Sequence, residues 1–307
     1  MKSILITGGT GLVGKRLIEI LLQHNYAVIV LTRKLPAKPA IPNVDYALWN
    51  VKSQTLDIAA VQKADAIIHL AGAGVMDKKW TTEYKKEIET SRTQSSNLLI
   101  KTLQNNQHKV KVLLSASAIG WYGGDNTLIQ SFTEDMPADN SFLGDVCKKW
   151  EQSVEAAEQL GIRVCKLRTG IVLSNNGGAY KEFKTPTKLG VAAILGNGKQ
   201  IVSWIHIDDL CLQYLYLLTN ENLQGNYNAV APTPVSNKTL TLTIAKKRAF
   251  FIPFYVPTLI LKIMLGDRCV EILKSATVSA AKIMATGFQF KYPTIEHAVN
   301  ELEQKEH

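Results

Sequence analysis

The chain has 307 residues, of which 46% are hydrophobic and 20% are charged, and it carries a formal net charge of +9. This composition is ordinary for a globular protein with a substantial core, and the four cysteines lack the spacing of a metal site or a disulfide framework. The lysines are spread along the chain without a nucleic-acid motif, so we expect an anionic small molecule rather than a nucleic acid as partner.

The first predicted element is a short aliphatic strand, Ile4–Ile6, followed by a glycine-rich turn and a helix over Lys15–Gln23. This order predicts a pyrophosphate site, because unpaired backbone N–H groups and the helix dipole point at the anion. Gly8 permits the tight turn, Gly11 lets the backbone approach the phosphates, and Gly14 lets the helix pack closely. The alternative interpretation is a purely structural turn between strand and helix.

The second predicted strand, Ala27–Leu31, is followed by residues that distinguish between two cofactors. A carboxylate at the end of this strand would bond the ribose 2′-hydroxyl of NAD, whereas an arginine pairs with the 2′-phosphate of NADP. Arg33 stands here, with Lys34 beside it and Thr32 able to offer a hydroxyl. The pattern favours NADP over NAD, with a solvated basic loop as the alternative.

Aliphatic strands continue to alternate with helices over the first 170 residues. Further strands are predicted at Ala66–Leu70, Lys111–Leu114 and Arg163–Arg168, and helices at Thr82–Asn105 and Lys149–Leu160. This alternation predicts an α/β fold with a doubly wound parallel sheet, that is, a Rossmann fold.

Small and hydroxyl-bearing residues follow two of these strands. Ala71 and Gly72 would let the cofactor lie against the backbone. Ser115 and Ser117 end the next strand, where the nicotinamide is expected in a doubly wound sheet.

The regular alternation ends after residue 172, which suggests two parts. We predict an NADP-binding Rossmann domain over residues 1–172, with sheet elements returning around 200–230. Residues 173–307 are then mostly a smaller substrate-side lobe with a helical segment over about 249–302. Asp208 and Asp209 suit the start of a helix, because carboxylates there satisfy free N–H groups.

No apolar run approaches the length of a membrane span. The most apolar late stretch, Ala249–Leu265, is interrupted by Pro253, Pro257 and Lys262. The chain also leads directly into its first strand, so we expect no signal peptide, a cytoplasmic location and no membrane partner.

Motifs along the whole chain resemble the extended short-chain dehydrogenase/reductase superfamily. They are similar to one atypical branch, the epimerase family with a C-terminal DUF1731 segment. The motifs are Thr7–Gly14, Leu70–Gly72, Lys79–Thr81, Ser91-Arg92, Cys147–Glu151, Arg168–Ser174, Ser203–Leu210 and Gly287–Thr294.

This resemblance implies NADP as cofactor and a small-molecule substrate, with no metal. From spacing alone, Glu87 and Arg92 would be a solvated helix face, but the resemblance places them at the cofactor. A homodimer formed through the long helix from Thr82 is also implied. The implied cofactor contacts are Gly8, Thr10, Gly11, Leu12, Val13, Gly14, Thr32, Arg33, Leu70, Ala71, Gly72, Glu87, Arg92, Ser115 and Val172.

Catalysis is where the chain departs from the superfamily. There a Ser or Thr polarises the carbonyl, a Tyr moves the proton, and a Lys four residues later lowers the pKa of that Tyr. Ser117 fills the first role, but the Tyr and Lys positions fall near Phe142 and Val146, neither of which transfers a proton. A substitute acid would come from Tyr122, Lys148, Lys149 or His206, of which Tyr122 is the catalytic candidate that we carry forward with Ser117.

Two functions remain open from the sequence. The first is an NADP-dependent oxidoreductase or epimerase that acts on a small carbonyl or hydroxyl compound such as a nucleotide sugar. The second is a catalytically silent NADP-binding sensor or interaction protein. Ser117 and the complete cofactor motif favour the first.

Overall fold

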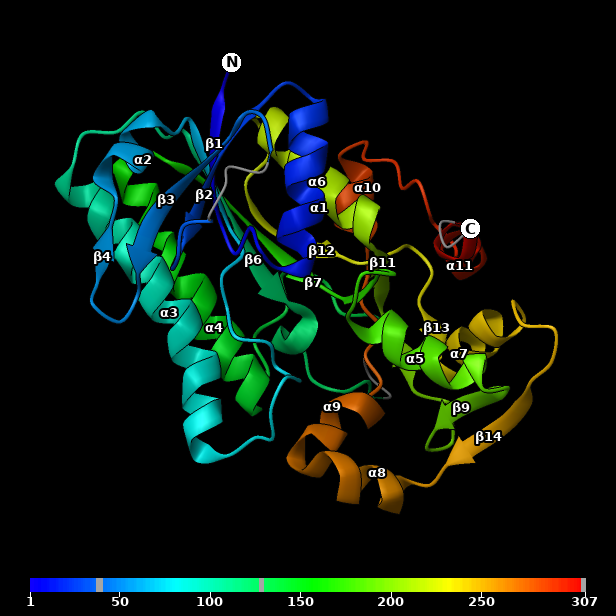
Figure 1. The fold of residues 1–307 in the computed structure, drawn as a ribbon. Coiled ribbons are helices and arrows are strands. Elements are labelled where there is room, and N and C mark those ends of the chain that lie inside the picture. Colours follow the sequence, from blue (N-terminus) through cyan, green and yellow to red (C-terminus); the bar gives the residue numbers. More distant parts are fainter. Residues whose placement is uncertain (37–40, 127–129, 305–307) are drawn as a thin grey trace.

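The computed structural model describes residues 1–36, 41–126 and 130–304, and its centre is an eight-stranded sheet with helices on both faces (Figure 1). The strand order is β12-β7-β6-β5-β1-β2-β3-β4, and all neighbours are parallel except β3 and β4. The predicted α/β Rossmann fold is confirmed. In chain order the strands are β1 (Ser3–Thr7), β2 (Ala27–Thr32), β3 (Val44–Asn50), β4 (Thr55–Leu56), β5 (Ala66–His69), β6 (Val112–Ala118), β7 (Arg163–Thr169) and β12 (Gly225–Ala229).

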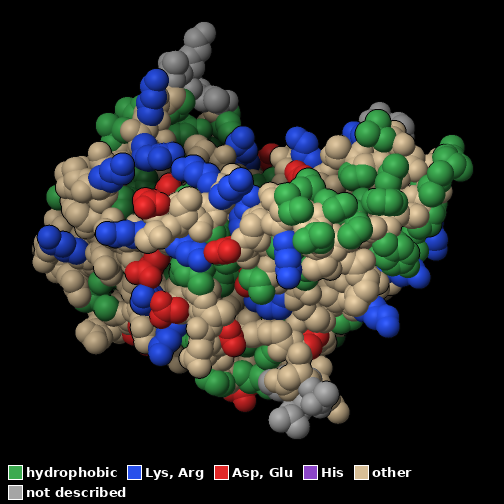
Figure 2. Space-filling model, turned by 90° about the horizontal axis from the view of Figure 1, so that it is seen from below, with side chains coloured by type: hydrophobic (Ala, Val, Ile, Leu, Met, Phe, Trp, Pro, Cys, Tyr) green, Lys and Arg blue, Asp and Glu red, His purple; other side chains and the backbone are tan. Residues whose placement is uncertain are grey.

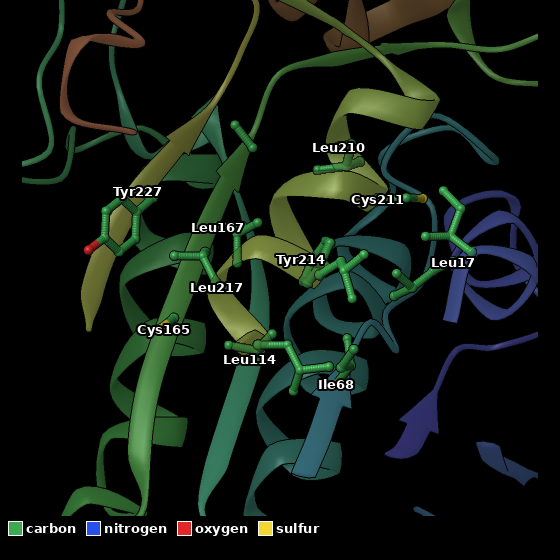
Figure 3. Close-up of a cluster of buried hydrophobic side chains, with 14 of the residues drawn as sticks. Leu17, Ile68, Leu114, Cys165, Leu167, Leu210, Cys211, Tyr214, Leu217 and Tyr227 are labelled. Carbon is green, nitrogen blue, oxygen red and sulfur yellow. The ribbon is translucent and has the colours of Figure 1, made fainter. Parts of the chain in front are cut away.

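One face of the sheet is covered by α1 (Leu12–Gln23) and α6 (Ile207–Thr219), which pack side by side. Leu17 of α1 and Tyr214 of α6 are buried with Ile68 and Leu167 of the sheet in one hydrophobic cluster (Figure 3). Because α6 lies far along the chain from α1, the helical layer on this face is completed only by residues beyond 200.

The other face is covered by α2 (Ile58–Lys63), α3 (Thr82–Asn105) and α4 (Phe142–Glu155). The helix predicted over Lys149–Leu160 is therefore placed wrongly at both ends. Ser141 caps α4 by accepting a hydrogen bond from Gly144 N at 3.3 Å, and a 3₁₀ turn (Glu158–Leu160) follows the helix. The earlier start places Phe142 and Val146 in the first turns of a helix.

A smaller lobe lies beside the sheet (Figure 1) and contains three two-stranded sheets. Leu173, Tyr180, Trp204 and Leu240 form its core with residues of the last helix. Its strands are β8 (Ile171–Leu173), β9 (Val191–Leu195), β10 (Ile201–Val202), β11 (Trp204–His206), β13 (Val235–Ser236) and β14 (Ile252–Val256). Its helices are α5 (Ala179–Lys188), α7 (Asn237–Ala245), α8 (Thr258–Leu265), α9 (Cys269–Leu273) and α11 (Ile295–Gln304), with a short 3₁₀ turn at Gly266–Arg268. Helix α10 (Ala281–Ala285) and a 3₁₀ turn at Ile119–Trp121 contact β12 and β7 of the large sheet instead.

The first turn of α6 joins the two parts of the molecule. Asp208 pairs with Arg16 of α1 at 2.6 Å, while the Asp209 carboxylate accepts Lys291 N at 2.8 Å and Tyr292 N at 2.9 Å. Burial raises the pKa of Asp209 to about 6, although those backbone donors act in the opposite direction. The two acids at the predicted helix start thus also connect α1 and the C-terminal segment to α6.

None of the helices in the described ranges is both long and apolar enough to cross a membrane.

Candidate cofactor and reaction site

The turn between β1 and α1 has the geometry that its glycines predict. Gly8 has a φ of +69°, and a Cβ atom on it would lie 2.9 Å from the carbonyl carbon of Leu70. A Cβ on Gly14 would lie 2.3 Å from the Gly8 carbonyl oxygen. Both positions therefore require glycine, because the strand, the turn and the helix approach one another closely.

The N-terminus of α1 is open to an anion. The helix begins at Leu12, three residues earlier than predicted, with Gly11 as its N-cap. No described side chain caps it and its first turn contains no acid, so Leu12 and Val13 present backbone N–H groups beside the exposed Thr10. Val172, in β8, precedes a loop whose Gly178 reaches this point: a Cβ there would lie 3.3 Å from Leu12 Cδ2.

A buried polar network holds the ends of β1 and β5 together. Thr7 Oγ1 lies 2.7 Å from His69 Nδ1 and accepts the backbone N–H groups of Leu70 and Ala71, each at 3.1 Å. The other His69 nitrogen lies 3.1 Å from Ser96 Oγ, and burial lowers the pKa of His69 to about 3, so the ring is neutral. The spacing of Thr7 and His69 in the sequence does not predict this network; its signal is a polar residue at the end of each of two buried strands.

Arg92 of α3 is buried next to Gly72, in the segment that follows β5. Its interpretation as part of a solvated helix face is therefore wrong. Its guanidinium carbon lies 4.9 Å from the ring centroid of Trp150, and Nη1 donates to the Ile88 carbonyl oxygen at 2.8 Å. A Cβ on Gly72 would lie 3.1 Å from that same carbon. No carboxylate of the described chain pairs with Arg92, and burial lowers its pKa. A buried cation without a counter-ion fits a site that receives an anion.

The other predicted polar contacts lie at the surface. Glu87 is half-exposed and pairs with Lys78 at 3.3 Å, so the structure separates it from Arg92. Arg33 is exposed at the end of β2, and Thr32 Oγ1 donates to the Lys34 carbonyl oxygen at 2.9 Å.

The two serines that end β6 differ in their surroundings. Ser115 is buried, and its hydroxyl bonds the neighbouring Ala116 carbonyl oxygen at 3.0 Å. Ser117 donates its hydroxyl hydrogen to Glu151 Oε1 of α4 at 2.6 Å. Arg168 of β7 holds both oxygens of that carboxylate, at 2.8 and 3.0 Å. Because Ser117 gives its hydrogen to a carboxylate, it does not have that hydrogen free to polarise a carbonyl.

Tyr122 belongs to the same buried network and is not placed as a proton donor. Its hydroxyl donates to Asn228 Oδ1 at 2.8 Å and accepts from Arg168 Nη1 at 3.0 Å. The ring is 1% exposed, and burial raises the pKa of Tyr122 to about 12. We therefore correct the predicted catalytic role of Tyr122, because its hydroxyl both donates and accepts a hydrogen bond within the protein.

The positions of the missing Tyr and Lys form an apolar cluster between α3 and α4. Val146 is buried with Tyr84 and Ile88, and Phe142 packs edge-on against Trp80 with ring centroids 5.1 Å apart. The hydroxyl in this cluster, that of Tyr84, donates to the Gly74 carbonyl oxygen at 2.5 Å, and burial raises the pKa of Tyr84.

The remaining substitute acids lie elsewhere. Lys148 is exposed, and Lys149 pairs with Glu89 at 2.8 Å and Asp145 at 2.7 Å on the outer surface of α4. His206 is the buried N-cap of α6, where its Nε2 lies 2.9 Å from a Glu301 oxygen. The described residues contain no cluster of three or more His, Cys, Asp or Glu side chains arranged for a metal ion.

Comparison with known proteins agrees with this geometry. Residues 4–230 match the NAD dependent epimerase/dehydratase family, and residues 256–302 match the domain of unknown function DUF1731. The chain belongs to the NAD dependent epimerase/dehydratase family. The family resemblance inferred from the sequence motifs is thus confirmed, together with an NAD(P)-binding Rossmann fold.

Members of this family resemble the chain along nearly its whole length. Epimerase family protein SAR0825 of Staphylococcus aureus is 38% identical, over 99% of this chain and 100% of the relative. The crystal structure of human epimerase family protein SDR39U1 (isoform 2) with NADPH is 26% identical, with a TM-score of 0.84 over 98% of this chain and 99% of the human one. A nucleoside-diphosphate sugar epimerase from Corynebacterium glutamicum is 30% identical with a TM-score of 0.77, over 98% of this chain and 58% of that protein.

Proposed function

We propose that the protein binds NADP(H) at the β1–α1 turn and acts as an oxidoreductase or epimerase on a small carbonyl or hydroxyl compound. The observation that carries this proposal is the cofactor cradle. Side chains have no room at Gly8 and Gly14, the start of α1 is free of acids, and Arg92, buried behind Gly72, pairs with no carboxylate of the residues that the structure describes. The human relative, whose structure contains NADPH, supports the same cofactor.

Each part of the cradle suits one part of the cofactor. The first turn of α1 would hold the diphosphate, exposed Arg33 the 2′-phosphate, and the backbone after Leu70 the ribose. When bound, the cofactor supplies hydride transfer to or from a substrate carbon.

Ser117 and Glu151 are the pair that would handle the proton. Arg168 donates hydrogen bonds to both oxygens of the Glu151 carboxylate, and this carboxylate accepts the Ser117 hydrogen at 2.6 Å. The Ser117 oxygen is then oriented to accept a hydrogen from a substrate hydroxyl while its own proton moves to Glu151. In this proposal the pair takes the place of the absent Tyr and Lys. The sequence does not predict it, because Glu151 lies in a helix far along the chain from Ser117.

A second candidate is a protein that binds NADP(H) without turnover. The apolar cluster around Phe142 and Val146 favours it, because the usual proton donor is replaced by packed side chains.

The cofactor assignment is tested by fluorescence titration of Arg33→Ala with NADPH and NADH. We expect NADPH to bind at least about tenfold more weakly and NADH binding to change little, because only NADPH carries the 2′-phosphate. Lys101→Ala, which removes an exposed cation from α3, is the control and should change neither affinity. An unchanged NADPH-to-NADH ratio in Arg33→Ala would contradict the assignment.

The reaction is tested with Ser117→Ala and Glu151→Gln in a screen of carbonyl compounds and alcohols followed at 340 nm. With a compound that the unaltered protein turns over, Ser117→Ala is expected to lower the rate by roughly 10²- to 10⁴-fold and to keep NADPH affinity. Glu151→Gln should lower it similarly. Turnover that persists in Ser117→Ala would exclude Ser117, and NADPH binding with no turnover of any compound would favour the silent protein.

A further inference from the structure

The lobe presents an unusual outer surface on the sheet of β9 and β14. Paired strand residues share a face, so the register places Val191, Ala193 and Leu195 of β9 beside Ile252, Phe254 and Val256 of β14. Ala192 and Ile194, which point the other way, are buried in the lobe. The outer face of this sheet is thus apolar, and Ile252 and Phe254 are 58% and 53% exposed on it.

Helix α8 extends this surface. Leu261 is the buried residue of α8, while Ile263 is 75% and Leu259 69% exposed. Figure 2 shows many hydrophobic side chains gathered on this side of the molecule. We call the following set the apolar face: Leu189, Phe250, Ile252, Phe254, Leu259, Ile260, Ile263 and Met264.

The size of the apolar face indicates a binding surface. At roughly 100 Å² for each half-exposed side chain, it offers on the order of 1,000 Å², above the few hundred Å² that a monomer commonly exposes in one patch. Its residues are separate from the cofactor cradle, so any partner is independent of the proposed reaction.

Positive charge accompanies the apolar face. Lys246, Lys247 and Lys262 are exposed around it, and the nearby acid Asp267 pairs with Lys85 at 3.2 Å. Lys262 is exposed within α8 itself, and Lys188 is exposed next to Leu189. Lysine and arginine side chains border the green area along part of its edge in Figure 2.

We propose that the apolar face docks on an anionic lipid bilayer. Aliphatic and aromatic side chains would enter the boundary between headgroups and acyl chains, while the lysine ammonium groups reach lipid phosphates. The net charge of +9 favours the same surface. A second copy of the chain fits less well, because a two-fold contact would bring the exposed Lys188 and Lys262 of both copies to one interface. The expectation of no membrane partner rests on the lack of a segment long enough to span a bilayer, and docking on a bilayer surface needs no such segment.

The test is flotation of the full-length protein with vesicles of phosphatidylcholine alone or with phosphatidylglycerol added. We expect binding to the anionic vesicles only, weakening as salt rises. Ile263→Glu is expected to reduce binding at least about tenfold, and Lys262→Glu by roughly fivefold or more. Ile58→Glu is the matched control, because Ile58 is an exposed isoleucine (45%) in the first turn of α2.

NADPH titration and thermal unfolding of each variant establish that it is folded. Failure of the unaltered protein to float with anionic vesicles would overturn the proposal, as would equal losses in Ile263→Glu and Ile58→Glu. A dimer in light scattering that Ile263→Glu dissociates, without vesicle binding, would assign the apolar face to a second copy instead. None of these outcomes depends on turnover, so they leave the proposed function to be tested separately.

Discussion

The glycine turn after β1 and the buried network after β6 lie at the same carboxyl edge of the sheet, yet they are built from different parts of the chain. The turn consists of backbone within residues 7–14, and its shape depends on side chains being absent. The network consists of side chains from β6, β7, α4 and β12, namely Ser117, Arg168, Glu151 and Asn228, with Tyr122 between them. A site made from contiguous backbone is visible in a sequence, whereas a site made from distant side chains is visible only in the fold.

The largest expected effect comes from breaking the network at Arg168. Arg168→Met leaves the Glu151 charge buried without its partner, so we expect the free energy of unfolding to fall by about 3–5 kcal/mol. Lys78→Met, which breaks the exposed pair with Glu87, is the control and should cost at most about 1 kcal/mol. Urea unfolding of both variants measures their free energies of unfolding. Similar losses in the two variants would contradict a special contribution of the buried Arg168–Glu151 pair to stability.

The matching change in the turn is Gly14→Ala. The added Cβ meets the Gly8 carbonyl oxygen at 2.3 Å, so strand and helix must separate where the cofactor binds. We expect NADPH to bind at least about tenfold more weakly in fluorescence titration. Gly124→Ala is the control because its Cβ would have only ordinary contacts, the nearest at 3.6 Å from Lys274 Cγ. An unaltered affinity in Gly14→Ala would mean that the turn tolerates a side chain.

The smallest effect is a pair of opposite pH dependences. His69, with a pKa lowered to about 3, contributes stability that is present above its unfolded pKa of 6.5 and is lost as pH falls towards 3. Asp209, with a pKa raised to about 6, contributes stability that is present below pH 3.8 and is lost as pH rises through 6. Unfolding between pH 4 and 7 should lose less stability on acidification in His69→Gln and more in Asp209→Asn, by at most about 1.4 kcal/mol per pH unit. Parallel curves for both variants would contradict the assignment.

The elements that the sequence predicts well are those with a local physical cause. The aliphatic strands and the glycine turn follow from hydrophobic patterning and from the absence of a Cβ, and neither needs knowledge of the fold. The prediction of a helix start at Lys149 is wrong because α4 already begins at Phe142, where the Ser141 side chain caps it. Arg92 could not be placed by spacing, because its burial depends on Trp150 of another helix.

The predicted site residues show the same contrast between local and distant physical causes. Gly8, Gly11 and Gly14 lie where the turn requires them, but Ser117 was assigned a role without its partner Glu151, 34 positions along the chain. The position of Tyr122 after β6 suggests a proton donor. In the fold, however, its hydroxyl already donates a hydrogen bond to Asn228 of β12.

The late arrival of β12 has a consequence for how the protein is made. β7 is complete at Thr169, but its outer edge is covered only by Gly225–Ala229, after the chain has formed much of the lobe. α6 and Phe288 belong to the same hydrophobic cluster as α1. On the ribosome, the nucleotide-binding half therefore emerges first with an unpaired strand and an uncovered sheet face, and it closes only when the last quarter of the chain has been synthesised.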